Sequence, residues 1–126
     1  MFKFKKQERL CSKKSIEKLY KEGKTILLYP LKITYLITNE QDFSFPAKVL
    51  FVVPKKKFKK AVQRNRIKRL LRENYRLSKN VFYQVLKSKE KNILISISYI
   101  ANEEKKFDEI NDATKLALHK ILDNII

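Results

Sequence analysis

Hydrophobic residues near the start of the chain recur at helical spacing and predict a first helix over 13–22. We expect Ser12 or Ser15 to cap the start of this helix and Gly23 to end it. Its apolar face consists of Ile16, Leu19 and Tyr20. At this stage Tyr20 has two interpretations, because it can pack in the core or line a groove.

After this glycine the spacing changes to that of extended chain. A short strand is expected over 25–28 and a longer one over 31–38, where β-branched and aromatic residues alternate between two faces. The polar residues 39–44 predict a turn, and an apolar strand follows over 47–53. We expect this strand to be central and to pair antiparallel with the strand before it.

Helical spacing returns in the second half of the chain. Nothing breaks a helix from about residue 60 to 77, and residues 78–80 predict an interruption before a helical stretch over 81–86. A strand over 92–100 and a final helix over 107–126 complete the chain. The order α-β-β-β-α-β-α predicts an α+β fold, a two-layer sandwich with a small central sheet and the basic helix packed on it. At this length we expect a single domain over 1–126.

Positive charge is concentrated in one stretch. Residues 55–76 contain eleven lysines or arginines against one acidic residue, Glu73, in a chain of net charge +17. On a helix, one side carries the apolar residues Ile67, Leu70, Leu71 and Tyr75. Most of the arginines fall on the other side, with Arg64 and Lys68 near the border. Like charges at i and i+4 destabilise a helix by roughly 0.2–0.5 kcal/mol per pair. A polyanion relieves this repulsion, so we expect a nucleic-acid-binding surface rather than a merely solvated face.

The residues that the chain uses sparingly exclude several kinds of site. One glycine cannot build a P-loop or a dinucleotide fingerprint, and one cysteine with one histidine cannot build a Cys/His zinc site. Cys11 is expected to be a small packing residue in a protein of the reducing cytoplasm. No apolar run is long enough to span a membrane, so no membrane partner is expected, and no pattern indicates an obligate protein partner.

No pair of carboxylates is spaced for catalysis or for holding a metal, so we expect a binding protein without catalytic residues of its own. Single-stranded nucleic acid is gripped by aromatic rings beside a basic groove. Tyr20 and Tyr35 can supply such rings, with Lys56 and Lys57 nearby, although half-buried packing is about as good an interpretation for each tyrosine.

The run VVPKKKFKKAVQRNRIKRLLRENYR resembles the signature of bacterial ribonuclease P proteins. The match consists of a Lys-Lys turn, an Arg-Asn-Arg core, an Ile-Lys-Arg-Leu segment and one further arginine: Lys56-Lys57, Arg64-Asn65-Arg66, Ile67-Lys68-Arg69-Leu70 and Arg72. The first helix also resembles the family's pattern, and the resemblance extends over nearly the whole chain.

This resemblance implies the protein subunit of an endoribonuclease. In that family a separate RNA subunit removes the 5′ leader of precursor tRNA by magnesium-dependent hydrolysis, so Mg²⁺ is expected with the RNA rather than on protein side chains. By motif match, the residues implied to contact the RNA subunit are Arg64, Asn65, Arg66, Lys68, Arg69 and Arg72. Those implied to line a cleft for the single-stranded leader are Ile16, Tyr20, Tyr35, Lys56 and Lys57. The implied partners are the ribonuclease P RNA and precursor tRNA.

Two positions depart from the family's pattern. Lys59-Lys60 stands before Ala61-Val62 where the family commonly has Gly-Asn, so this turn must use a backbone conformation open to any residue. Ile16 stands where the family often has phenylalanine, and an aliphatic side chain does not stack on a base as an aromatic ring does.

Two other classes of nucleic-acid-binding protein fit the charge pattern. A structural RNA-binding protein, such as a ribosomal component, would copurify with ribosomal subunits and have no effect on tRNA processing. A DNA-binding regulator would need base-reading residues near the start of its recognition helix and usually a dimer interface. No apolar patch in the sequence clearly nominates such an interface.

Overall fold

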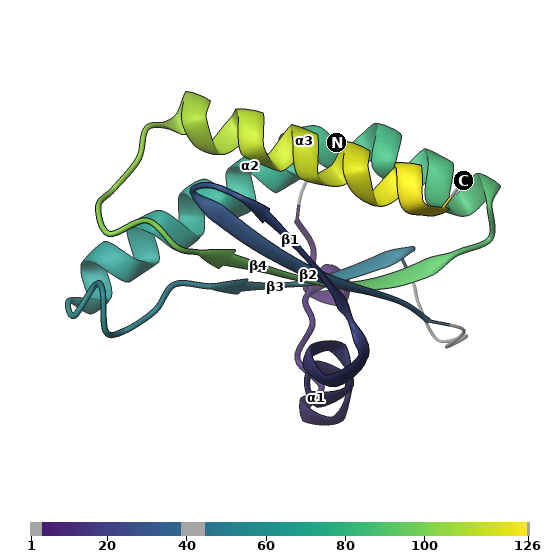
Figure 1. Cartoon of the computed structure of the whole chain (residues 1–126), viewed down its shortest axis with the longest axis horizontal. Coiled ribbons are helices and arrows are strands. Elements are labelled where there is room, and N and C mark those ends of the chain that lie inside the picture. The colour runs from purple at the N-terminus through teal and green to yellow at the C-terminus, as the bar shows by residue number, and fades with distance from the viewer. Residues whose placement is uncertain (1–3, 39–44, 126) are drawn as a thin grey trace.

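The computed structural model describes residues 4–38 and 45–125. Its elements are η1 (Lys6–Glu8), α1 (Lys13–Glu22), β1 (Lys24–Leu28), β2 (Leu31–Thr38), β3 (Ala47–Val52), α2 (Ala61–Ser88), β4 (Asn92–Tyr99) and α3 (Phe107–Ile125). Helices α2 and α3 cover one face of a small sheet, the helical face, and α1 lies against the other, the α1 face (Figure 1). The predicted α+β class and element order are confirmed, and the expected turn over 39–44 lies outside the described residues.

The four strands are arranged in the order β1-β2-β4-β3. The prediction that the strand over 47–53 is central and antiparallel to its predecessor is therefore wrong. β3 lies at the edge and runs parallel to β4, whereas β2 and β4 pair antiparallel in the middle. Strands that follow each other along the chain usually lie side by side. Here β4 is buried on both faces from residue 93 to residue 97, and a strand of this kind requires neighbours on both edges and cover on both faces.

The main core lies between the sheet and the helices α2 and α3. Alternate residues of β2 and β4 point into it, and the predicted apolar side of α2 packs on them through Ile67, Leu71 and Tyr75, each no more than 1% exposed. Burying one such side chain contributes about 1.5–3 kcal/mol. The basic helix is thus held in place by the side opposite to its exposed charges.

Helix α2 is continuous from Ala61 to Ser88, and the predicted interruption at 78–80 is wrong. That segment contains no glycine or proline, and its middle residue, Lys79, is buried. The Lys79 ammonium lies 2.5 Å from a carboxylate oxygen of Glu8, whose side chain is fully buried. The two residues are far apart in the sequence, so no local pattern predicts this ion pair. It joins the segment before α1 to the middle of α2.

Helix α1 begins and ends as predicted. The Ser12 hydroxyl accepts a hydrogen bond from the Ser15 amide at 3.3 Å, so Ser12 is the capping residue. A Cβ atom at Gly23 would lie 2.4 Å from the Leu19 carbonyl oxygen, so only glycine permits this close approach. Leu19 is fully buried and packs with Leu10 and Leu94 against the α1 face.

The buried ion pair generates a prediction about stability. Replacing Lys79 by Met should lower the free energy of unfolding by roughly 3–5 kcal/mol, because the Glu8 carboxylate is left buried without its cation. The double variant Glu8→Gln/Lys79→Met should recover most of this loss in urea denaturation. If the double variant were as unstable as the single one, the cost would come from packing rather than from the unpaired charge.

Candidate nucleic-acid interface

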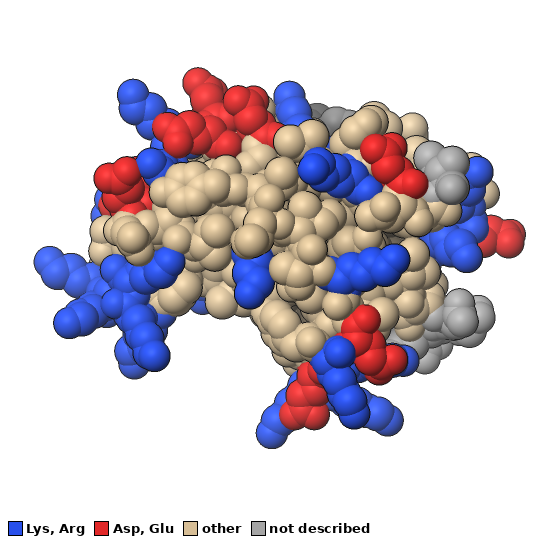
Figure 2. Space-filling model, in the orientation of Figure 1, with Lys and Arg blue, Asp and Glu red and all other residues tan. Residues whose placement is uncertain are grey.

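Lysine and arginine side chains gather at the end of the molecule where β3 leads into α2 (Figure 2). Acidic side chains gather instead near the start of α3, whose first turn contains Asp108 and Glu109. The end of the molecule where β3 leads into α2 therefore presents a localised positive field to a polyanion.

The lysine loop, residues 54–60, has a defined conformation. Phe58 is buried against Tyr99, with ring centroids 5.8 Å apart, and its amide donates to the Pro54 carbonyl oxygen. Arg64 Nη1 donates to the carbonyl oxygens of Phe58 and Lys59, both at 2.9 Å. Lys60 has φ −82° and ψ 128°, an extended conformation that any residue adopts. The backbone of Lys60 thus has a conformation open to any residue, as expected for the Lys59-Lys60 turn. The Arg64 side chain stabilises the loop through its two hydrogen bonds to loop carbonyl oxygens.

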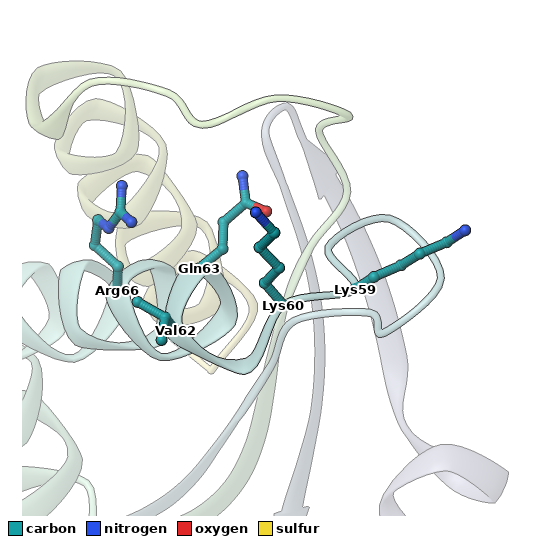
Figure 3. Close-up of a pocket in the computed structure, with 5 residues that line it drawn as sticks. All are labelled: Lys59, Lys60, Val62, Gln63 and Arg66. Atoms are coloured by element: carbon teal, nitrogen blue, oxygen red, sulfur yellow. The ribbon is translucent and has the colours of Figure 1, made fainter.

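A hollow of about 550 Å³ opens beside the first turns of α2 (Figure 3). The side chains of Lys60, Gln63 and Arg66 point to the same side of the helix, whereas Lys59 extends away from it. Glu104, from the loop before α3, accepts a hydrogen bond from Gln63 at 3.2 Å and lies 3.4 Å from Arg66. Exposed ion pairs contribute only about 0–1 kcal/mol, so an RNA phosphate can replace Glu104 on Arg66 at little cost.

The remaining predicted RNA-binding residues fall on two sides of α2. Asn65 and Arg69 are exposed on its outer surface, whereas Lys68 and Arg72 are half-buried and line a groove toward the N-terminal segment. The six residues of the motif thus form an outer surface and a side surface, with Arg64 turned into the lysine loop.

Glu73, the one acidic residue of the basic stretch, is paired within the helix. Arg76 donates to both of its carboxylate oxygens, and these hydrogen bonds lower the pKa of the Glu73 carboxyl. Glu73 is therefore ionised at neutral pH and neutralises Arg76.

The predicted leader-binding residues lie in two places. Tyr20 is 50% exposed, and its hydroxyl is 2.6 Å from the Ser96 hydroxyl on the α1 face of β4. Ile16 is half-buried one turn earlier and packs against the small core under α1. Lys56 and Lys57 are exposed in the lysine loop, where the Lys57 ammonium donates to the Ile100 carbonyl oxygen at 2.5 Å. The structure thus brings Ile16 and Tyr20 together on α1. Both lysines lie beyond the C-terminal end of β3, in the lysine loop.

Tyr35 does not join them, and its predicted place beside Tyr20 is wrong. Its side chain is 3% exposed on the helical face, and its hydroxyl accepts a hydrogen bond from Asn124 of α3 at 2.7 Å. Neighbouring residues of a strand point to opposite faces, so Thr34 occupies the position on the α1 face. A shift of one residue moves a strand side chain across the sheet.

Three residues that shape these surfaces were not predicted from the sequence. Ser96 anchors Tyr20, Glu104 holds Arg66, and Arg9 lines the groove beside Lys68 and Arg72. The serines that alternate with isoleucine in β4 indicated a mixed polar and apolar face that includes Ser96. Glu104 and Arg9 are surface charges without a local pattern in the sequence. Cys11, expected to be a packing residue, is exposed because it faces this same groove.

In residues 4–38 and 45–125, no group of three or more histidine, cysteine, aspartate or glutamate side chains is arranged to hold a metal ion. Over the same part of the chain, no helix has the length and apolar character needed to cross a membrane.

The loop contacts of Arg64 generate a prediction that separates it from the rest of the motif. Arg64→Lys keeps the charge but loses the guanidinium Nη1 that donates to the carbonyl oxygens of Phe58 and Lys59, so the loop should open more easily by about 1 kcal/mol. Amide exchange of Phe58 should then be about fivefold faster. Arg69→Lys, an exposed substitution of the same kind, is the control; equal exchange rates in the two variants would contradict this role for Arg64.

Comparison with known proteins assigns the chain to a family. A family model described as Ribonuclease P matches residues 4–122. A "Ribonuclease P protein component" from Porphyromonas gingivalis is 34% identical over 124 residues, which cover 98% of this chain and 90% of that protein.

Solved structures share the fold. The RNase P protein from Thermotoga maritima has a TM-score of 0.71 at 22% identity, covering 90% of this chain and 96% of that one. The Staphylococcus aureus RNase P protein has a TM-score of 0.64 at 21% identity, covering 90% of this chain and 94% of that one. The family model and the Porphyromonas gingivalis relative favour the ribonuclease P interpretation over a structural ribosomal component. The chain belongs to the ribonuclease P family, as a protein component of that endoribonuclease.

Proposed function

We propose that this protein holds the 5′ leader of precursor tRNA on the α1 face of its sheet while α2 contacts the ribonuclease P RNA. The RNA, with its bound Mg²⁺, carries out the hydrolysis, and the protein contributes binding and positioning in the cytoplasm. The observation that carries this proposal is the half-exposed Tyr20 ring, fixed by its hydroxyl to the edge of an uncovered part of the sheet.

The register of the strands defines the uncovered part of the α1 face. One row across the sheet is Leu50, Ser96, Thr34 and Thr25, and Tyr20 is anchored there through Ser96. The next row, toward the lysine loop, is Val52, Ser98, Lys32 and Leu27, all half-buried or exposed. This second row offers a mixed apolar and cationic floor beside an aromatic ring, the combination that binds unpaired nucleotides.

Beyond this floor lies the lysine loop. Leu50, in the Tyr20 row, and Lys56 are six positions apart along the chain, which at strand spacing is at most roughly 20 Å. A leader segment of several nucleotides can therefore stack on Tyr20 at one end and place its phosphates near Lys56 and Lys57 at the other. Phosphate contacts position the strand without reading its sequence.

The outer surface of α2 is the proposed contact for the RNA subunit. Asn65 and Arg69 are exposed there, and Arg66 pairs with the exposed Glu104 carboxylate. Arginine forks suit paired phosphate oxygens in a folded RNA. The two RNAs are thus assigned to different surfaces of one small domain.

Substitution of Tyr20 tests the leader assignment. Stacking on an aromatic ring contributes about 1–3 kcal/mol per base, so Tyr20→Ala should weaken precursor tRNA binding by the RNA–protein complex about 5- to 150-fold. Binding of mature tRNA, which has no leader, should be unchanged in the same equilibrium titration.

Tyr20→Phe is the matched control. It keeps the ring and removes the hydrogen bond to Ser96, so precursor binding should stay close to that of the unmodified protein. Equal losses for precursor and mature tRNA in Tyr20→Ala would contradict the assignment of the leader to this face.

A further inference from the structure

A groove of about 180 Å³ lies at the β3 edge of the sheet, between α2 and the N-terminal segment, residues 4–11. Its cations are Arg9 from the N-terminal segment and Lys68 and Arg72 from α2. Its apolar lining includes Leu10 and Leu50. Residues about sixty positions apart in the sequence thus converge on one small surface.

The backbone holds the N-terminal segment in place along this edge. The Leu10 amide donates to the Val49 carbonyl oxygen at 3.0 Å, and Arg9 and Val49 form a parallel β-bridge. Immediately before Arg9, the buried Glu8 carboxylate is paired with Lys79 of α2. Arg9 is therefore held between two anchors, and its position beside α2 is set by the fold.

The charge of the groove is not balanced within the part of the chain that the structure describes. Arg9, Lys68 and Arg72 make no ion pair or side-chain hydrogen bond with another described residue. By contrast, Arg66, Arg76 and Lys105 each have a carboxylate partner. Three cations around an apolar floor match an RNA strand, whose phosphates need cations and whose sugars and bases accept apolar contact.

The groove also lies between the two surfaces described above. Lys68 and Arg72 belong to the Arg-Asn-Arg helix, whereas Leu10 and Leu50 belong to the small core on which α1 rests. We propose that the groove binds the phosphodiester backbone of an unpaired RNA segment that passes from the α2 surface to the α1 face, with Arg9 as an additional binding residue. This proposal rests on the proposed function, because it places a third contact between the two RNA surfaces.

Cys11 provides a direct probe of the groove in the unmodified protein. It is the chain's single cysteine, it is exposed, and it lines the groove. The rate of Cys11 alkylation by iodoacetamide is measured for the free protein and with saturating ribonuclease P RNA, precursor tRNA or mature tRNA. We expect at least a tenfold slower reaction with an RNA that occupies the groove. Protection by ribonuclease P RNA alone identifies the strand as part of that subunit, and additional protection by precursor but not mature tRNA identifies it as leader.

Arg9→Gln tests the charge itself, with Lys120→Gln, an exposed position on α3, as the control for a general loss of one positive charge. Loss of one phosphate contact should weaken binding about fivefold at 0.1 M salt and make the slope of log K against log salt shallower by roughly 0.7–1. Lys120→Gln should leave the slope unchanged. Equal changes in the two variants would overturn the groove as a specific contact.

The outcomes separate this proposal from the proposed function. If Cys11 reacts at the free rate in a complex that still removes leaders, the groove is empty in the assembly and this proposal fails while the function stands. If the protein neither binds these RNAs nor supports leader removal, both fail together.

Discussion

The arrangement of the molecule depends on the burial of β4 on both faces. Its isoleucines pack under α2 and α3, while Leu94 and Ser96 on the other face are covered by α1. A central strand of this kind requires two covering layers, and the layers carry the two candidate RNA surfaces. Because α1 covers only part of its face, Tyr20 stands at the boundary between a packed core and an open floor.

Helix α2 combines two demands that compete in most helices. It must be held firmly, and its buried side, from Ile67 to Leu86, packs in the core and holds it in place. It must also keep many like charges close together, which destabilises an isolated helix. The structure resolves this by distributing the cations around the helix: Arg64 supports the lysine loop, Arg66 meets Glu104, and Lys68 with Arg72 faces the groove. Only part of the charge is left for a ligand to neutralise.

Local patterns in the sequence predict the elements well and their partners less well. The bounds of α1 and the buried side of α2 follow from helical spacing and capping, which are local properties. The edge position of β3 and the continuity of α2 through Lys79 depend on contacts between distant residues, and Glu8 shows no local signal of its buried partner. The placement of Tyr35 failed for a related reason, because the motif indicates the strand but only the register decides its face.

We propose above that the chain completes a ribonuclease P whose RNA subunit performs the hydrolysis. Reconstitution tests it most directly: the purified protein is mixed with the ribonuclease P RNA of the same organism at low Mg²⁺, and removal of the 5′ leader from a precursor tRNA is followed. We expect cleavage by protein and RNA together under conditions where neither cleaves alone, because the protein's cations would replace part of the Mg²⁺ requirement. If the protein bound RNA with a steep salt dependence yet added nothing to cleavage, it would not act as the subunit that completes this ribonuclease P.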